Sequence, residues 1–191
     1  MQPIGDEYAT LLLTRWFSLV SGVQDPDVRA ARVLEDLAAA GHRELIGNPM
    51  MLTIAALVSA DDHGPPKGRH DLYHHFLRTL IQRRPEYRAA KLPELPVDGQ
   101  LELLQALAWE LQSGGRGAFA RSELAEKARA AGIGSAAAED WLDFLLGSAE
   151  LLVEVEADQL NFMHREIRSY LAACSLAVRT DFVQAVQDTY M

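Results

Sequence analysis

The chain has 191 residues, 49% of them hydrophobic, and its 27 acidic and 18 basic side chains give a formal net charge of −9. This composition predicts a globular chain with one large domain or two small ones, and the charge argues against general binding to nucleic acid or anionic membranes. The single cysteine, Cys174, excludes an internal disulfide or a cysteine-based zinc site and favours a cytoplasmic location. No apolar run is long enough to span a bilayer, and the first residues lack the pattern of a signal peptide.

The first half of the chain carries the pattern of successive helices. Residues 6–20 place apolar side chains three and four apart, which predicts an amphipathic helix whose apolar face is Tyr8, Leu11, Leu12, Trp16 and Leu19. A second helix is predicted from Pro26 to a stop at Gly41. Residues 48–58 begin with an Asn-Pro cap and are apolar on nearly every side, which predicts a helix buried all round. After a turn-rich loop, a further helix is predicted over residues 72–81.

A change in charge and two prolines indicate a domain boundary near residue 97. Residues 1–60, 61–96 and 97–191 carry net charges of −3, +2 and −8, which together make the −9 of the whole chain. Pro93 and Pro96 interrupt any helix just before the last of these changes. We therefore predict three parts: a helical domain over 1–96, a winged-helix domain over 97–179, and the truncated start of a further helical segment over 180–191.

The second domain takes its expected fold from the order of its elements. Helical spacing predicts three helices, and a final helix begins near Arg165 and ends near Thr180. Between them, β-branched residues in near-alternation on both sides of a polar turn predict a β-hairpin. The three helices span 99–112, 122–132 and 136–146, and the two strands span 151–155 and 160–163. The predicted fold class is therefore mainly α, a helical bundle followed by a winged-helix domain with a small β-hairpin.

The chain lacks the motifs that enzymes of the common classes need. It has no Gly-rich phosphate-binding loop ending in Gly-Lys-Ser or Gly-Lys-Thr, no dinucleotide-binding glycine motif and no nucleophile in a Gly-x-Ser-x-Gly turn. We predict no catalytic residue, and no enzyme activity for this chain alone. His70, His74 and His75 cluster on one predicted helix, but a metal site needs a further ligand. They are interpreted as a helix face, and no metal site is predicted.

A winged helix often binds DNA through its third helix, so the charges on that helix decide between two interpretations. Here it carries Glu139, Asp140 and Asp143 and neither Lys nor Arg. These carboxylates would repel phosphates in the major groove. We therefore interpret the domain as a packing and switching module rather than a DNA-binding one.

Two helix starts are candidate ligand contacts. Asn48 and Pro49 begin the helix predicted to be buried, where a ring and free amides could press against a planar base or accept a phosphate. An ordinary Asn-Pro cap is the alternative. His164 lies between the second strand and the last helix, where its imidazole could donate a hydrogen bond to an anion. A structural role in capping or packing is the alternative for this histidine.

Three stretches of the chain resemble a known family. They are Ile-Gly-Asn-Pro-Met-Met-Leu-Thr-Ile-Ala-Ala-Leu-Val (46–58), Arg-His-Asp-Leu-Tyr-His-His-Phe-Leu (69–77) and Phe-Met-His-Arg-Glu-Ile-Arg-Ser-Tyr-Leu-Ala-Ala (162–173). Together they resemble the region that follows the ATPase core in bacterial NACHT-type signal-transduction ATPases, which are relatives of animal NOD-like receptors. The resemblance extends over nearly all of residues 1–178 and includes the opening residues 3–7.

The resemblance implies a nucleotide switch with three sensing residues in this chain. In the family, the proline of the Asn-Pro helix packs near the adenine, and the winged-helix histidine contacts the β-phosphate of ADP in the inactive state. Asn48, Pro49 and His164 are thereby expected to sense the nucleotide. Ile167 replaces the aromatic residue usual after the histidine motif, and the chain itself lacks the phosphate-binding loop.

The resemblance also implies the partners and the setting. No cofactor is expected in this chain, and ADP or ATP with Mg²⁺ is expected in the parent protein. The expected partners are the missing NACHT ATPase core in cis and, for the parent, further copies in a homo-oligomer, with no nucleic acid and no membrane. The expected setting is cytoplasmic, in bacterial signalling or innate-immunity-like defence. The main alternative is a stand-alone α-helical protein-protein interaction module, followed by a DNA-binding winged-helix regulator.

Overall fold

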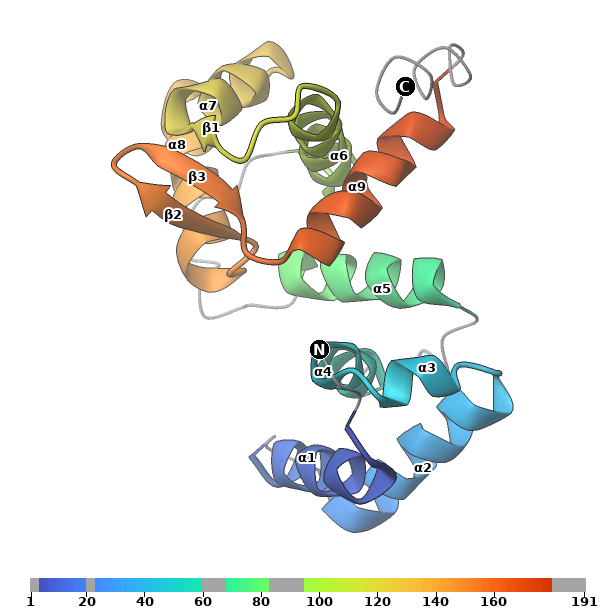
Figure 1. Ribbon diagram of the computed structural model, residues 1–191. Helices are drawn as coiled ribbons and strands as arrows, with labels where there is room; N and C mark the ends of the chain where they lie inside the picture. The colour runs from blue at the N-terminus through green and yellow to red at the C-terminus, as the bar shows by residue number, and fades with distance from the viewer. Residues whose placement is uncertain (1–3, 20–22, 60–67, 83–94, 180–191) are drawn as a thin grey trace. The chain divides into compact units, whose positions relative to one another are not determined.

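The computed structural model describes residues 4–19, 23–59, 68–82 and 95–179 (Figure 1). This part of the chain is mainly helical and contains a small three-stranded antiparallel sheet. The predicted class, mainly α with a helical bundle and a small β-hairpin, is therefore confirmed. No described helix has both the length and the apolar character needed to cross a membrane.

The chain divides into two compact units, Met1–Thr79 and Leu80–Met191, and the division falls inside helix α5, Arg69–Gln82. The domain boundary predicted from the sequence lies between residues 96 and 97, where α6 begins. Pro93, which helped to place it, and the predicted last segment, residues 180–191, lie outside the described residues. The boundary and the last segment therefore remain predictions.

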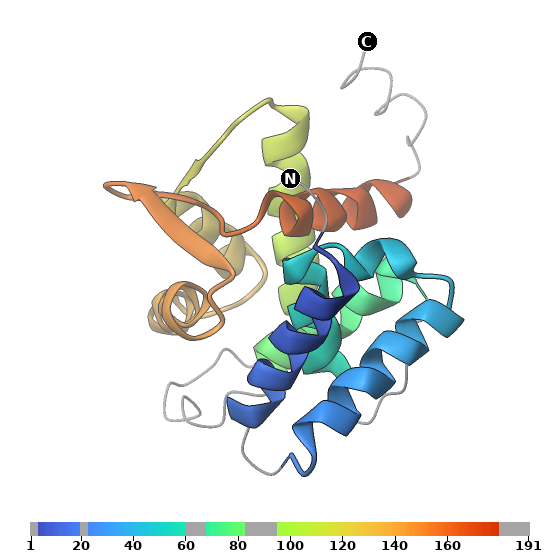
Figure 2. The same cartoon turned by 60° about the horizontal axis from the view of Figure 1, so that its bottom comes forward.

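Unit 1 holds four helices before α5: α1 (Asp6–Leu19), α2 (Pro26–Ala39), α3 (Arg43–Ile46) and α4 (Pro49–Ser59). Helix α1 packs against α2 and α4, and Figure 2 shows α1 lying alongside α2. The end of α2 follows the sequence prediction, because Gly41 adopts a φ of 80°, which an L side chain disfavours. The amide of His42 then donates to the carbonyl of Leu37 at 2.8 Å and closes the helix end.

The face by which α1 packs differs from the sequence prediction. The buried side chains are Ala9, Leu13 and Phe17, spaced one turn apart. Of the predicted apolar face, Tyr8 and Leu11 are exposed, and so is Leu19. The prediction was wrong because α1 carries apolar side chains on most of its circumference, so periodicity alone does not select one stripe. The packed stripe holds small Ala9 and large Phe17, so shape complementarity with neighbouring helices decides the face.

Helix α4 agrees in part with the prediction of a helix buried all round. One broad side is fully buried, and the opposite side, which includes Thr53 and Leu57, is partly buried. The fully buried side chains are Met51, Leu52, Ile54, Ala55, Ala56 and Val58. At its C-terminal end, the guanidinium of Arg29 from α2 donates a hydrogen bond to the carbonyl of Ser59. A cation at this end also complements the helix dipole. Helix α4 is thus the centre of the unit 1 core.

Unit 2 has the element order and the sheet of a winged helix. Its sheet has the strand order β1-β3-β2, with both pairs antiparallel, and α9 packs against α6 and β3. The elements are α6 (Val97–Ser113), β1 (Phe119–Ala120), α7 (Arg121–Ala130), α8 (Ser135–Asp143), a π-helical turn (Phe144–Ser148), β2 (Leu152–Glu156), β3 (Gln159–Phe162) and α9 (Arg165–Ala177).

Two elements of unit 2 are additions to the sequence prediction. Strand β1 has two residues, and Phe119 pairs with Leu160 of β3. A strand this short has no periodicity to recognise, so only the neighbouring β3 defines it. The third predicted helix ends earlier than expected, at Asp143, and continues as the π-helical turn. Its apolar side chains Phe144 and Leu145 remain buried in the core.

A buried polar contact fixes α8 against α6. The indole of Trp141, which is fully buried, donates to the side-chain oxygen of Gln100 at 2.9 Å. The amide nitrogen of Gln100 donates in turn to the carbonyl of Leu95 at 2.9 Å. Buried polar groups without partners are costly, so this chain of hydrogen bonds favours one register between the two helices.

Candidate functional site

The start of α9 is the first candidate site, and His164 precedes it directly. Strand β3 ends at Phe162, and the amide of Met163 donates to the carbonyl of Leu151 at 3.0 Å, which fixes the approach to the helix. His164 has extended backbone (φ −125°, ψ 130°), and its carbonyl accepts from the amide of Arg168 at 3.1 Å. Its side chain is exposed and caps no helix amide. The imidazole is therefore accessible from solvent.

Two arginines lie in the first turn of α9 beside His164. Arg165 is exposed, whereas the Nε atom of Arg168 is buried and makes no hydrogen bond within the part of the chain that the structure describes. Arg168 lies four residues after His164, on the same side of the helix. Glu166 adds one opposing negative charge in this turn. The first-turn amides, the helix dipole and these cations together favour an anion at this helix start.

Sequence reasoning missed Arg168, although a signal for it was present. Residues four apart on a helix lie on one face, so the helix predicted from Arg165 already placed Arg168 next to His164. The burial of its Nε atom without a hydrogen-bond partner became visible only in the structure. A buried N–H group without a hydrogen-bond partner lowers the stability of the fold.

The start of α4 has a different chemistry. The Oδ1 atom of Asn48 accepts hydrogen bonds from the amides of Met50 at 3.0 Å and Met51 at 3.4 Å. Pro49, the first residue of the helix, is half-buried and has no amide proton to offer. An anion could reach these two amides only by displacing Asn48. The Asn48 side chain thus serves as a helix cap, and Pro49 keeps an accessible ring surface.

The three predicted sensing residues fall into the two units. Asn48 and Pro49 are neighbours in unit 1, and His164 belongs to unit 2. Neither Pro49 nor His164 is sealed inside its own unit, since the first is half-buried and the second is exposed. Both side chains therefore meet the minimum condition for contact with an outside ligand. Their sensing role remains a prediction.

The third helix of the winged helix presents the carboxylates that its sequence indicated. Glu139, Asp140 and Asp143 of α8 are all exposed. Arg121, at the start of α7, donates to Asp143 at 2.6 Å and to Glu139 at 3.2 Å. These hydrogen bonds, that to Asp143 foremost, raise the pKa of Arg121. One arginine shared by two carboxylates leaves the outer face of α8 acidic, which disfavours contact with DNA phosphates.

At the start of α7, a glutamate of the first turn binds the amide of the N-cap residue. Glu123 reaches back to accept from the amide of Ala120 at 2.8 Å, and Arg116 donates to both of its carboxylate oxygens, at 2.9 and 2.6 Å. The hydrogen bond from Arg116, more than any other contact, lowers the pKa of Glu123. This contact satisfies the amide of the N-cap residue, whereas Ala120 has no side-chain acceptor for the first-turn amides of α7.

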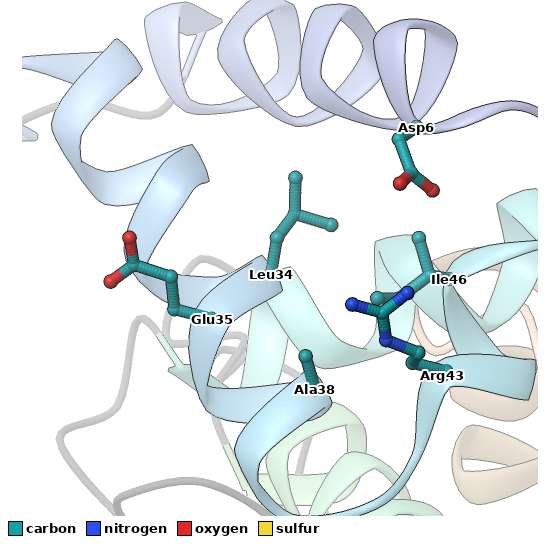
Figure 3. Close-up of a pocket in the computed structure, with 6 residues that line it drawn as sticks. All are labelled: Asp6, Leu34, Glu35, Ala38, Arg43 and Ile46. Carbon is teal, nitrogen blue, oxygen red and sulfur yellow. The ribbon is translucent and has the colours of Figure 1, made fainter.

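A pocket of about 340 Å³ lies within unit 1 (Figure 3). Its polar groups come from Asp6 at the start of α1, Glu35 of α2 and Arg43 of α3. In Figure 3 the side chains of Asp6 and Arg43 point toward the same space. The pocket combines these charges with an apolar wall of Leu34, Ala38 and Ile46. It holds no side chain with the nucleophile and base arrangement that covalent catalysis needs.

Histidines of the cluster on α5 contact one another and Asp71. The rings of His70 and His74 stack with their centroids 5.9 Å apart, and the Nε2 atom of His75 lies 3.3 Å from a carboxylate oxygen of Asp71. Across the described residues, no group of three or more His, Cys, Asp or Glu side chains is arranged to hold a metal ion. The contacts to Asp71 and between the rings give the cluster a structural role on its own helix.

Comparisons with protein families, with curated proteins and with solved structures found no match to this chain. The functional conclusion must therefore come from the residues and their geometry. At the start of α9, an accessible imidazole, two arginines, first-turn amides without a side-chain cap and a helix dipole act together.

Proposed function

We propose that this chain is the regulatory helical and winged-helix segment of a NACHT-type signal-transduction ATPase. In this proposal it senses whether ADP or ATP is bound by an ATPase core in the same polypeptide, and it switches the assembly of the parent protein, in cytoplasmic bacterial signalling or defence. The core would supply the phosphate-binding loop and Mg²⁺. This chain would contribute no catalytic residue, and Pro49 and His164 would contact the nucleotide.

The accessible imidazole of His164 at the open start of α9 carries the proposal. A histidine that served only as a cap or as packing would be engaged within its own unit, whereas this side chain is exposed and its helix amides have no side-chain acceptor. Arg168 supports the same reading, because its buried Nε atom lacks a hydrogen-bond partner in the described chain. A phosphate at this position would accept a hydrogen bond from the exposed imidazole, and the helix dipole and the nearby guanidinium groups would favour its charge.

The proposed mechanism is a two-state switch. With ADP in the core, the nucleotide bridges the core and the winged helix through His164, and exchange for ATP removes the bridge, so that the helical units rotate and chains assemble. One hydrogen bond to a charged phosphate contributes about 1.5 to 3 kcal/mol. This amount biases an equilibrium between two states but does not hold ADP by itself. The isolated chain is accordingly expected to bind ADP weakly or not at all.

The decisive experiment uses the longer polypeptide that contains the ATPase core. The rate at which a fluorescent ADP analogue leaves the protein is measured for the wild type and for His164→Ala. Loss of one charge-assisted hydrogen bond is expected to speed release by about ten- to a hundredfold. Arg129→Ala is the matched control, since Arg129 is exposed near the end of α7 and lies away from the start of α9.

Two results would contradict the proposal. The first is a reading frame around this segment that encodes no phosphate-binding loop before it. The second is an unchanged rate of ADP release in His164→Ala while the variant keeps the circular-dichroism spectrum of the wild type. An equal change in His164→Ala and Arg129→Ala would also count against it, because the effect would then be electrostatic and unspecific.

A stand-alone α-helical protein-protein interaction module is the second candidate, and one observation favours it. Helix α1 exposes Tyr8, Leu11 and Leu19 along one side. Contiguous apolar side chains on a surface are typical of protein interfaces. This candidate needs no nucleotide, so an unaltered ADP release rate in the experiment above would leave it as the better explanation of the chain.

A further inference from the structure

Helix α1 carries an apolar stripe on its solvent side, and the stripe contains one positive charge. The α1 stripe consists of Tyr8, Leu11, Leu12, Arg15, Trp16 and Leu19, which follow one another at intervals of three and one residues along one side of the helix. Its most exposed members, Tyr8 and Leu19, are 71% and 86% exposed. Arg15 lies near the middle and has no ion pair or side-chain hydrogen bond with any described residue.

The outward face of the β-hairpin is apolar too, but its charge is negative. Alternation along β2 and β3 buries Leu152, Leu160 and Phe162 and turns Val153 and Asn161 outward. Val153, Val155 at a register shift of β2, and Met163 just after β3 are apolar and between 38% and 50% exposed. We call these three residues and Glu156 the wing face.

Glu156 belongs to this outward face because of an irregularity in the sheet. Val153 pairs with Asn161, and the register shifts between Glu154 and Glu156, so that Glu156 pairs with Gln159. Gln159 and Asn161 point to the same side of β3, and Glu156 therefore points to the same side as Val153. Its exposed carboxylate has no ion pair with any described residue.

The two faces are complementary in composition and charge. Each offers exposed apolar side chains around one charged group that has no ion pair within the described part of the chain, positive on the α1 stripe and negative on the wing face. Apolar surface of this kind gains free energy on burial, and an opposite charge in register adds specificity. The methionine of the wing face also adapts its shape to a partner.

We propose that the α1 stripe of one copy of this chain binds the wing face of a second copy, with Arg15 paired to Glu156. The contact joins two different surfaces, so each added copy presents one free stripe and one free wing face. A symmetric pairing of two α1 stripes fits less well, because it would bring two Arg15 guanidinium groups together near the middle. The proposal goes beyond the nucleotide switch, and its test needs no nucleotide.

The test measures the mass of the full 191-residue chain by sedimentation equilibrium over a wide range of concentrations at moderate salt. The average mass of the wild type is expected to rise with concentration past that of a dimer, since a contact between unlike surfaces propagates. Arg15→Glu and Glu156→Arg are each expected to weaken association about tenfold or more, because like charges then face one another. Arg32→Glu and Glu126→Arg, which change exposed side chains outside the two faces by the same charge, are expected to associate as the wild type does.

Restored association between two variants is the most discriminating part of the test. In an equimolar mixture of the Arg15→Glu chain and the Glu156→Arg chain, each variant face meets an oppositely charged one, and the chain with both substitutions likewise has matched faces. Both samples are expected to regain association. A wild type that stays monomeric at every concentration overturns the proposal, as does association that Glu156→Arg leaves intact or that the mixture fails to restore. Circular-dichroism melts identify any variant that has lost its fold. The variants that remain folded are the ones used to test the proposed contact.

Discussion

The starts of α4 and α9 have similar sequence signals but different local chemistry. Asn48 closes the start of α4 by accepting the amides of Met50 and Met51. His164 holds the equivalent place before α9 and makes no such contact, so the first-turn amides keep their donor capacity for something else. The comparison teaches that a helix start becomes a candidate ligand site only where the chain's own side chains leave it open.

The largest expected effect concerns the start of α4, where Asn48 caps the helix. Asn48→Ala removes both hydrogen bonds to the cap and is expected to destabilise the fold by about 1 kcal/mol. Urea unfolding followed by circular dichroism measures the change. Asn48→Asp is the matched control, since its carboxylate keeps the cap and suits the helix dipole. Equal losses in the two variants would mean that the cap does not stabilise α4.

The next effect is an increase in folding stability, and it concerns the start of α9, where no side chain caps the first-turn amides. His164→Asn supplies an acceptor for the amides of Glu166 and Ile167 and is expected to stabilise the fold by about 0.5 to 1 kcal/mol. The same urea titration detects it. His164→Ala serves as the reference, and it is expected to unfold within about 0.5 kcal/mol of the wild type. A large loss of stability in His164→Ala would show that the imidazole is a structural group after all.

The smallest effect concerns the start of α7, where the charged side chain of Glu123 accepts from the amide of Ala120. The pKa of Glu123 is lowered in the folded state, so its contribution to stability is present above its ordinary pKa of 4.5 and is lost as the pH falls through the folded value. Glu123→Gln keeps an acceptor for Ala120 but no charge, and is expected to lose about 0.5 kcal/mol at neutral pH. The difference between wild type and variant, measured by urea unfolding at a series of pH values, is expected to shrink below pH 4.5. A constant difference would exclude the ion pair as its cause.

The sequence predicted the order of the elements well because the signals for that order are local. A proline at the start of α2, Gly41 after its end and the Asn-Pro cap of α4 each act within one helical turn. The apolar character of α4 on all sides is equally visible in the residues themselves. The mainly α class and the winged-helix order followed from such local signals.

The candidate site was predictable only in part. His164 and Asn48 were recognisable as helix starts, but nothing in the sequence distinguishes a cap that closes its helix from one that does not. Arg168 was predictable by its spacing from His164, whereas the burial of its Nε atom depends on which groups pack around α9. The difference between the two starts is therefore a property of packing.

By itself, the sequence determined the order of the helices and where most of them begin, because caps, turns and breakers work through neighbouring residues. The tertiary structure alone decided which stripe of α1 is buried and that a two-residue strand joins the sheet. Both depend on the shape and hydrogen bonds of a partner elsewhere in the chain. Periodicity identifies an apolar stripe on a helix, but a stripe becomes part of the core only where a neighbouring element packs against it. In α1 the remaining apolar side chains stay exposed, where another molecule can bind them.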